Sequence, residues 1–126
     1  MTITELRRKA LEKLQVIAAG EPVHASDGQL VQAKYEALHD ILLQDNLIDW
    51  VVTEEIPIAY GQIMVAMLAA ECVDEFYCPS ELKAAIIGAG KYDLPAQLGG
   101  PSVAERRLRK LAAPGFNGQP AQPDYY

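Results

Sequence analysis

The chain has 126 residues, of which 50% are hydrophobic, and a formal net charge of −6. This length and composition predict one globular domain that buries roughly two thirds of its unfolded surface and needs no metal or disulfide to fold. The spacing of the two cysteines, Cys72 and Cys78, excludes a Cys-x-x-Cys motif and does not match zinc-ligand pairs, so we expect reduced thiols in a cytosol. Because Met1 leads directly into a charged helical pattern, we expect no signal peptide.

The negative charge is concentrated in the middle of the chain. Residues 14–101 contain three basic and thirteen acidic groups, a balance of −10, whereas residues 1–13 carry +2, residues 102–112 carry +3 and the remaining tail carries −1. This negative charge argues against nucleic-acid binding by residues 14–101. It suits a surface along which DNA passes without being bound. The longest apolar run, residues 56–70, is shorter than the roughly 20 residues of a membrane span and has acidic flanks, so it predicts a buried core helix.

The first predicted helix begins at a capping box formed by Thr2 and Glu5 and ends near Gly20, before Pro22. The apolar residues that recur at helical spacing are Ile3, Leu6, Ala10, Leu14 and Ile17. Basic and acidic side chains fill the other face, which we expect to be solvated.

The second predicted helix opens on another capping box, Ser26 with Gln29, and ends near Asn46 as a left-handed cap. Its apolar stripe consists of Leu30, Ala33, Ala37, Ile41, Leu38 and Leu42. His24 and His39 have no cysteine or second histidine at ligand spacing, so both are predicted to be surface residues.

The third predicted helix starts with Pro57 in its first turn, runs to about Tyr77 and is stopped by Pro79. We expect Trp50, which precedes it, to pack in the core. The same prediction applies to Met64, Met67 and Leu68.

The fourth predicted helix starts around Ser80 and runs through "LKAAIIGAGKY", with Gly88 and Gly90 loosening its final turns. The pattern G-x-x-x-x-G-K-[ST] of a phosphate loop fails there, because Ala85 stands at the first glycine position and Tyr92 follows the lysine.

A linker rich in proline and glycine, "LPAQLGGP", precedes the fifth predicted helix, which opens on Ser102 with Glu105 as a third capping box. A narrow apolar seam is formed by Ala104, Leu108 and Leu111. The prediction is therefore an all-α bundle of about four to five helices: a helical body over residues 1–98, a linker and basic amphipathic helix over 99–112, and an extended C-terminal tail over 113–126. With three prolines and two glycines from Pro114 on, the tail has too little apolar surface to fold alone.

The sequence contains no pattern that predicts catalysis. Ser26 and Asp27 follow His24 closely, but neighbours at a helix start seldom form a catalytic triad. The carboxylates of Glu71, Asp74 and Glu75 lack the Glu-x-x-His of di-iron bundles. We therefore expect no enzyme, no cofactor and no metal site.

The order of these elements resembles the head-to-tail adaptor proteins of tailed bacteriophages, above all the tail accessory factor of short-tailed phages and the related connectors of long-tailed ones. The likeness covers roughly residues 2–116 and rests on pieces such as "LRRKALEKLQV", "SDGQLVQAKYEALHDILLQDNLIDW", "AAIIGAGKY" and "ERRLRKLAAPG".

The resemblance implies a structural virion protein at the head–tail junction, made in the host cytoplasm. Subunits of such proteins form a ring, usually of about twelve copies, beneath the portal protein ring. The ring prolongs the channel for double-stranded DNA without sequence-specific binding, helps to retain the genome, and carries the tail, nozzle or next connector protein. The C-terminal segment commonly docks on the portal. The portal-binding residues implied here are Arg106, Arg107, Arg109, Lys110, Phe116, Tyr125 and Tyr126.

Two other classes of function stay open. A small DNA-binding regulator would use the basic helix at residues 102–112, although this helix follows a linker rather than the tight turn of a helix-turn-helix. A wall-degrading enzyme, an activity credited to some relatives of the adaptors, would need a catalytic residue that no motif of this chain supplies.

Overall fold

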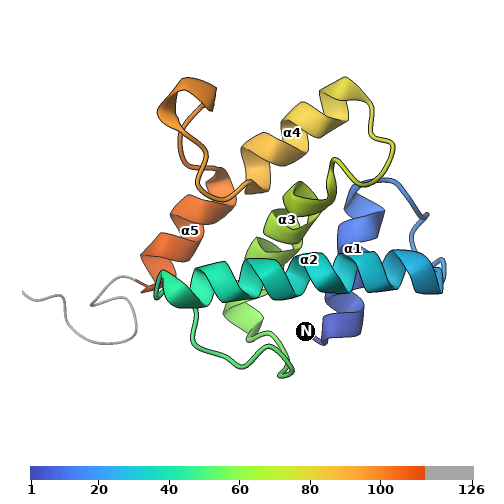
Figure 1. Cartoon of the computed structure of the whole chain (residues 1–126), viewed down its shortest axis with the longest axis horizontal. Helices are drawn as coiled ribbons and strands as arrows, with labels where there is room; N and C mark the ends of the chain where they lie inside the picture. Colours follow the sequence, from blue (N-terminus) through green and yellow to red (C-terminus); the bar gives the residue numbers. More distant parts are fainter. Residues whose placement is uncertain (113–126) are drawn as a thin grey trace, which may run out of the picture.

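A computed structural model describes residues 1–112, which contain five α-helices and no strand (Figure 1). This confirms the predicted all-α fold. The helices are α1 (Ile3–Lys13), α2 (Ala25–Gln44), α3 (Gly61–Cys72), α4 (Ser80–Gly90) and α5 (Val103–Ala112), with short 3-10 turns η1 (Ile58–Tyr60) and η2 (Ala96–Leu98). The predicted tail, with Phe116, Tyr125 and Tyr126, lies outside the described residues.

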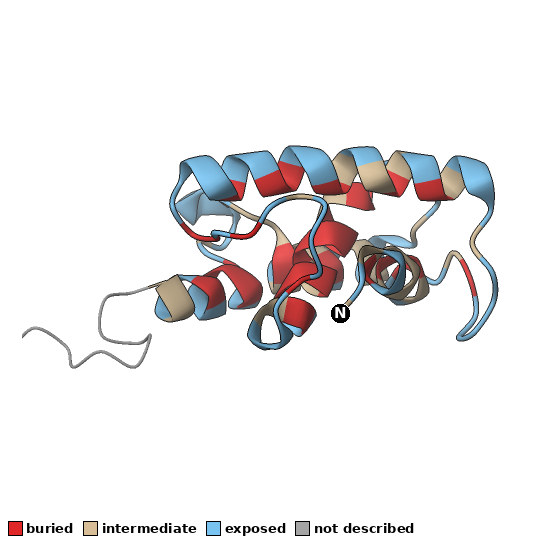
Figure 2. Ribbon diagram, turned by 90° about the horizontal axis from the view of Figure 1, so that it is seen from below, coloured by how far each residue is buried: buried red, intermediate tan, exposed pale blue. Residues whose placement is uncertain are grey.

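Helix α3 is the centre of the bundle. It packs against α1, α2, α4 and α5, and nine of its twelve residues are buried. A helix that is apolar all round has to be enclosed by others, and the long run of residues 56–70 therefore places α3 inside. Figure 2 shows α2 along one side of the molecule, with α1, α3 and α5 in the layer beneath it. The predicted core positions Trp50, Met64, Met67 and Leu68 are all buried.

The capping box at the start of α1 is confirmed, since Thr2 Oγ1 accepts the Glu5 N–H and the Glu5 carboxylate accepts the Thr2 N–H. The predicted end near Gly20 is wrong. The helix ends at Lys13 because Gln15 adopts a left-handed conformation, with φ of 62°. Leu14 and Ile17 are still buried, but from the cap and the loop that follow the helix.

The predicted capping box at Ser26 is also wrong. The N-cap of α2 is His24, and no side chain caps this end of the helix. Asn46 does adopt the predicted left-handed conformation, with φ of 60°. The predicted apolar stripe is rotated: Ala33, Ala37 and Ile41 are exposed. The residues that α2 buries are Gly28, Val31, Tyr35, Leu38, His39 and Leu42.

Hydrogen bonds explain this rotation. The Trp50 indole Nε1 donates to the Tyr35 hydroxyl at 3.1 Å, and His39 Nε2 lies 2.6 Å from the Trp50 carbonyl oxygen. Once their polar atoms are satisfied, Tyr35 and His39 can be buried with their rings against the core. The prediction that His39 is a surface residue is therefore wrong, whereas His24 is exposed as expected.

The third helix is shorter than predicted. Pro57 precedes the 3-10 turn η1, and α3 ends at Cys72 rather than near Tyr77. Helix α4 starts at Ser80 as predicted. Gly90 does not loosen its last turn: a Cβ atom there would lie 2.0 Å from the Ala66 carbonyl oxygen, so this glycine allows α3 and α4 to touch.

Among residues 1–112, no helix is both long enough and apolar enough to cross a membrane.

Candidate docking surfaces

Helix α5 carries an exposed cationic face next to the point where the tail begins. Ser102 starts the helix by accepting the Glu105 N–H on its hydroxyl, at 3.2 Å. The helix then packs against α3 and α4. Its buried residues are Ala104, Glu105 and Leu108. Arg106, Arg107 and Lys110, which we call the cationic face, are exposed and form no ion pair within residues 1–112.

The fourth basic residue of this helix, Arg109, makes contacts within the protein. Its Nε donates to the Glu105 carboxylate at 2.9 Å, and its guanidinium lies 5.9 Å from the centre of the Tyr92 ring. The hydrogen bond to Glu105 raises the pKa of Arg109. Glu105 is only 4% exposed and also accepts the Asp93 N–H, at 2.7 Å. The predicted third capping box is thus only half formed: Ser102 accepts the Glu105 N–H, but the Glu105 carboxylate accepts no hydrogen bond from the Ser102 N–H.

A hollow of about 430 Å³ adjoins the cationic face. It is lined by Ala59, Ile63, Arg107, Lys110 and Leu111. Next to Ala59, the side chain of Ile58 is 94% exposed. Apolar surface bordered by cations in this way suits a protein partner better than the regularly spaced phosphates of DNA.

A second surface lies along the C-terminal half of α2 and the loop that follows it. A groove of about 690 Å³, which we call the acidic groove, is lined by Glu36, His39, Asp40, Leu43, Asp49, Trp50, Val51 and Val52. Its three carboxylates are exposed and no lysine or arginine lines it. The apolar side chains Leu43 and Val51 are 43% and 57% exposed. This groove could not be predicted from the sequence, because it combines residues of α2 with residues of the loop that follows it.

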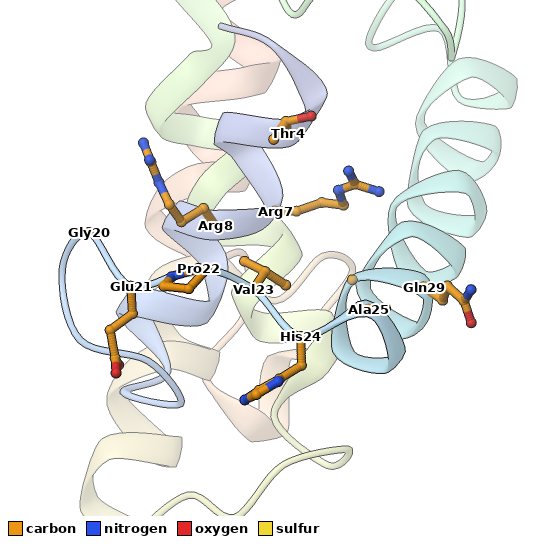
Figure 3. A pocket seen from close by; sticks show the side chains of 11 residues that line it. Thr4, Arg7, Arg8, Gly20, Glu21, Pro22, Val23, His24, Ala25 and Gln29 are labelled. Atoms are coloured by element: carbon orange, nitrogen blue, oxygen red, sulfur yellow. The ribbon is translucent and has the colours of Figure 1, made fainter.

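A third hollow, of about 560 Å³, lies between α1 and the start of α2 (Figure 3). The side chains of Arg7 and Arg8 point in different directions. Arg7 donates to the Gln32 side chain at 3.3 Å, and Arg8 Nε lies 3.7 Å from the Glu12 carboxylate. Arg7 therefore links α1 to α2, whereas Arg8 pairs within α1 with the carboxylate that also accepts the Gly20 N–H of the following loop, at 3.2 Å.

The residues weighed for catalysis do not converge. No hydrogen bond within the described part of the chain joins His24 to Ser26 or Asp27. Glu71 pairs with Lys91 at 3.1 Å, and Asp74 pairs with Lys83 at 2.6 Å. Residues 1–112 contain no group of three or more His, Cys, Asp or Glu side chains that could hold a metal ion.

Comparisons of this chain with protein-family models, with curated proteins and with solved structures find no match.

Proposed function

We propose that this protein is a structural adaptor of a phage virion: a ring-forming subunit that joins the portal of the capsid to the tail. The observation that carries the proposal is the cationic face of α5, which lies exposed immediately before the tail. Phe116, Tyr125 and Tyr126 would anchor the tail on the portal, while the cations would meet an acidic protein surface of the same assembly.

The charge of the body supports a protein partner over DNA. Arg106, Arg107 and Lys110 lie on a molecule of net charge −6, whose residues 14–101 carry thirteen acidic groups against three basic ones. Three phosphate contacts give weak, salt-sensitive DNA binding, which the acidic body would weaken further. The twelve residues between α4 and α5 are also too many for the tight turn of a helix-turn-helix.

The test is the mass of the complex formed when the protein is mixed with a portal ring from the same genome. We expect an increment of about twelve copies, as for a closed ring matched to its partner. Deletion of Gly115–Tyr126 should abolish portal binding and leave the helical content of the protein unchanged.

The outcomes separate the alternatives. Absence of a complex when both proteins are folded would contradict the adaptor role. Binding to DNA that weakens steeply with salt would then indicate a regulator that uses α5. Portal binding by the truncated chain would retain the adaptor role but remove the tail from it.

A further inference from the structure

The cationic face and the acidic groove are opposite in charge. On α5, Val103, Arg106, Arg107 and Lys110 follow one another at positions i, i+3, i+4 and i+7, so they form a single stripe. Val103 is 47% exposed, which adds an apolar side chain to the three cations. Because the apolar face of α5 is buried against its own core, this stripe is mainly cationic and suits a partner surface lined by carboxylates.

The acidic groove offers the matching features. The exposed side chains of Leu43 and Val51 provide apolar contact area, and the carboxylates of Glu36, Asp40 and Asp49 supply three negative charges. Its volume of about 690 Å³ exceeds that of the hollow beside α5. The stripe of α5 would place its three cations beside these carboxylates and Val103 against the exposed apolar side chains of the groove.

Helix α5 cannot move into the acidic groove of its own molecule, although the end of α5 and the loop after α2 border one hollow, which Ala112 and Asp49 both line. Helix α5 is fixed through Ala104 and Leu108, which are buried against the core, whereas the groove belongs to α2 and the loop after it. The partner that satisfies both surfaces is therefore a second copy of the chain. Used with two different neighbours, the two patches make a heterologous contact that generates a ring when the rotation closes, whereas reciprocal pairing of two copies gives a closed dimer. The sedimentation coefficient of the assembly distinguishes the two.

We propose that the cationic face of α5 docks in the acidic groove of the neighbouring copy and that this contact builds the ring. The inference rests on the proposed adaptor function and names the acidic surface that its cations meet. The contact places Arg107 and Lys110 against the neighbour's Asp40 and Asp49. The tail of each copy stays available for the portal.

Charge-swapped variants test the contact. One variant carries Arg107→Glu and Lys110→Glu, a second carries Asp40→Lys and Asp49→Lys, and a third combines all four changes. The substituted side chains are exposed, so circular dichroism should show unchanged helix content. Sedimentation velocity from about 1 μM to about 1 mM protein, alone and on the portal ring, measures self-association.

We expect each double variant to self-associate at least about tenfold more weakly than the natural chain, and the combined variant to regain association. A mixture of the two double variants should also associate, because the glutamates on α5 of the first variant meet the lysines in the groove of the second, and the natural α5 of the second meets the natural groove of the first. A mixture that associates as weakly as each double variant alone would overturn the inference. Natural-strength association of the Arg107→Glu, Lys110→Glu variant would overturn the inference. So would a combined variant that fails to recover, or a natural chain that does not associate even on the portal.

Cross-linking supplies an independent readout on the full chain. In a Cys78→Ser background, one copy carries Lys110→Cys and the other Asp40→Cys, and the two are mixed on the portal ring and oxidised. A covalent dimer supports the contact, and its absence overturns it. Glu81→Cys replaces Asp40→Cys in the control, because Glu81 is exposed on α4 away from both surfaces.

Portal binding, measured in parallel, separates this inference from the adaptor role. If the Arg107→Glu, Lys110→Glu variant loses portal binding but keeps self-association, the cations contact the portal instead. That result overturns the inference and supports the adaptor role. If no variant and no natural chain binds the portal, the adaptor role itself fails.

Discussion

Glu105 decides which cations of α5 are left for a partner. Its carboxylate is nearly inaccessible and accepts hydrogen bonds from the Asp93 N–H and the Arg109 side chain. A buried carboxylate is tolerated only when such bonds compensate for its lost hydration. One of the four basic residues of the helix therefore stabilises the fold, and the three cations of the cationic face are left exposed.

The two thiols should differ sharply in reactivity. Burial raises the pKa of Cys72 to about 12, and since the thiolate is the nucleophile, little of the reactive form exists near neutral pH. Cys78 is partly exposed. We expect a maleimide at pH 8 to label Cys78 at least about 100-fold faster than Cys72 in the folded protein, and both at similar rates in denaturant.

Cys78→Ser provides the control for this measurement, because the remaining thiol should then stay unlabelled until the chain unfolds. Rapid labelling of Cys72 in the folded control would show that the packing around α3 opens far more readily than its burial indicates.

The burial of His39 was not predicted from the sequence. Isolated histidines are usually exposed, and nothing in the local pattern marks this one as different. Its burial depends on the Trp50 carbonyl oxygen, eleven residues later. A contact across a loop cannot be inferred from helical periodicity, and the acidic groove was missed for the same reason.

At the level of helices, two serines that look alike in sequence should behave differently. Ser102 accepts the Glu105 N–H at the start of α5, whereas Ser26 makes no capping bond in α2. We expect Ser102→Ala to lower the free energy of unfolding by about 1 kcal/mol and Ser26→Ala to change it by less than about 0.5 kcal/mol. Urea unfolding measures both, and equal losses would contradict the assignment of the caps.

Two glycines of α4, Gly88 and Gly90, should respond in opposite ways to substitution by alanine. A Cβ at Gly90 would meet the Ala66 carbonyl oxygen at 2.0 Å, whereas nothing lies within 4 Å of one at Gly88. Gly90→Ala should therefore destabilise the protein by about 1–3 kcal/mol or more, because helix backbones must move apart. Gly88→Ala should stabilise it by about 0.4–1 kcal/mol. Thermal and urea unfolding check both signs, and a neutral Gly90→Ala would show that α3 and α4 are not in close contact.

The existence of the five helices could be predicted from periodicity, but their buried faces could not always be. Helix α3 is apolar on nearly all sides, so any rotation about its axis would bury apolar side chains. In α2, Ala33, Ala37 and Ile41 are as apolar as the buried positions, yet they face solvent. The buried face of α2 includes Tyr35 and His39, whose polar atoms are satisfied by Trp50, and this contact across the loop is not visible in the helical pattern.

At the scale of the whole molecule, opposite charges are separated onto different elements. Eight of the thirteen acidic groups of residues 14–101 lie on α2 and the loops next to it, and the unpaired cations of residues 102–112 lie on α5. In the proposed ring, this separation of charge would favour association between copies while the acidic body repels DNA. The cationic helix was evident from the sequence, whereas its complement was not, because the groove combines residues from α2 with the loop after it.

A peptide of residues 113–126 tests whether the tails act together. In a ring of about twelve copies each tail needs only weak affinity, since the first bound tail places the others at high effective concentration. We therefore expect the peptide to compete for the portal ring at least about 100-fold more weakly than the full protein, as measured by fluorescence anisotropy. A peptide with Phe116→Ala, Tyr125→Ala and Tyr126→Ala should not compete. If the natural peptide matched the full protein in affinity, assembly into a ring would add nothing to attachment, and a ring-building contact between α5 and the groove would have no role in portal binding.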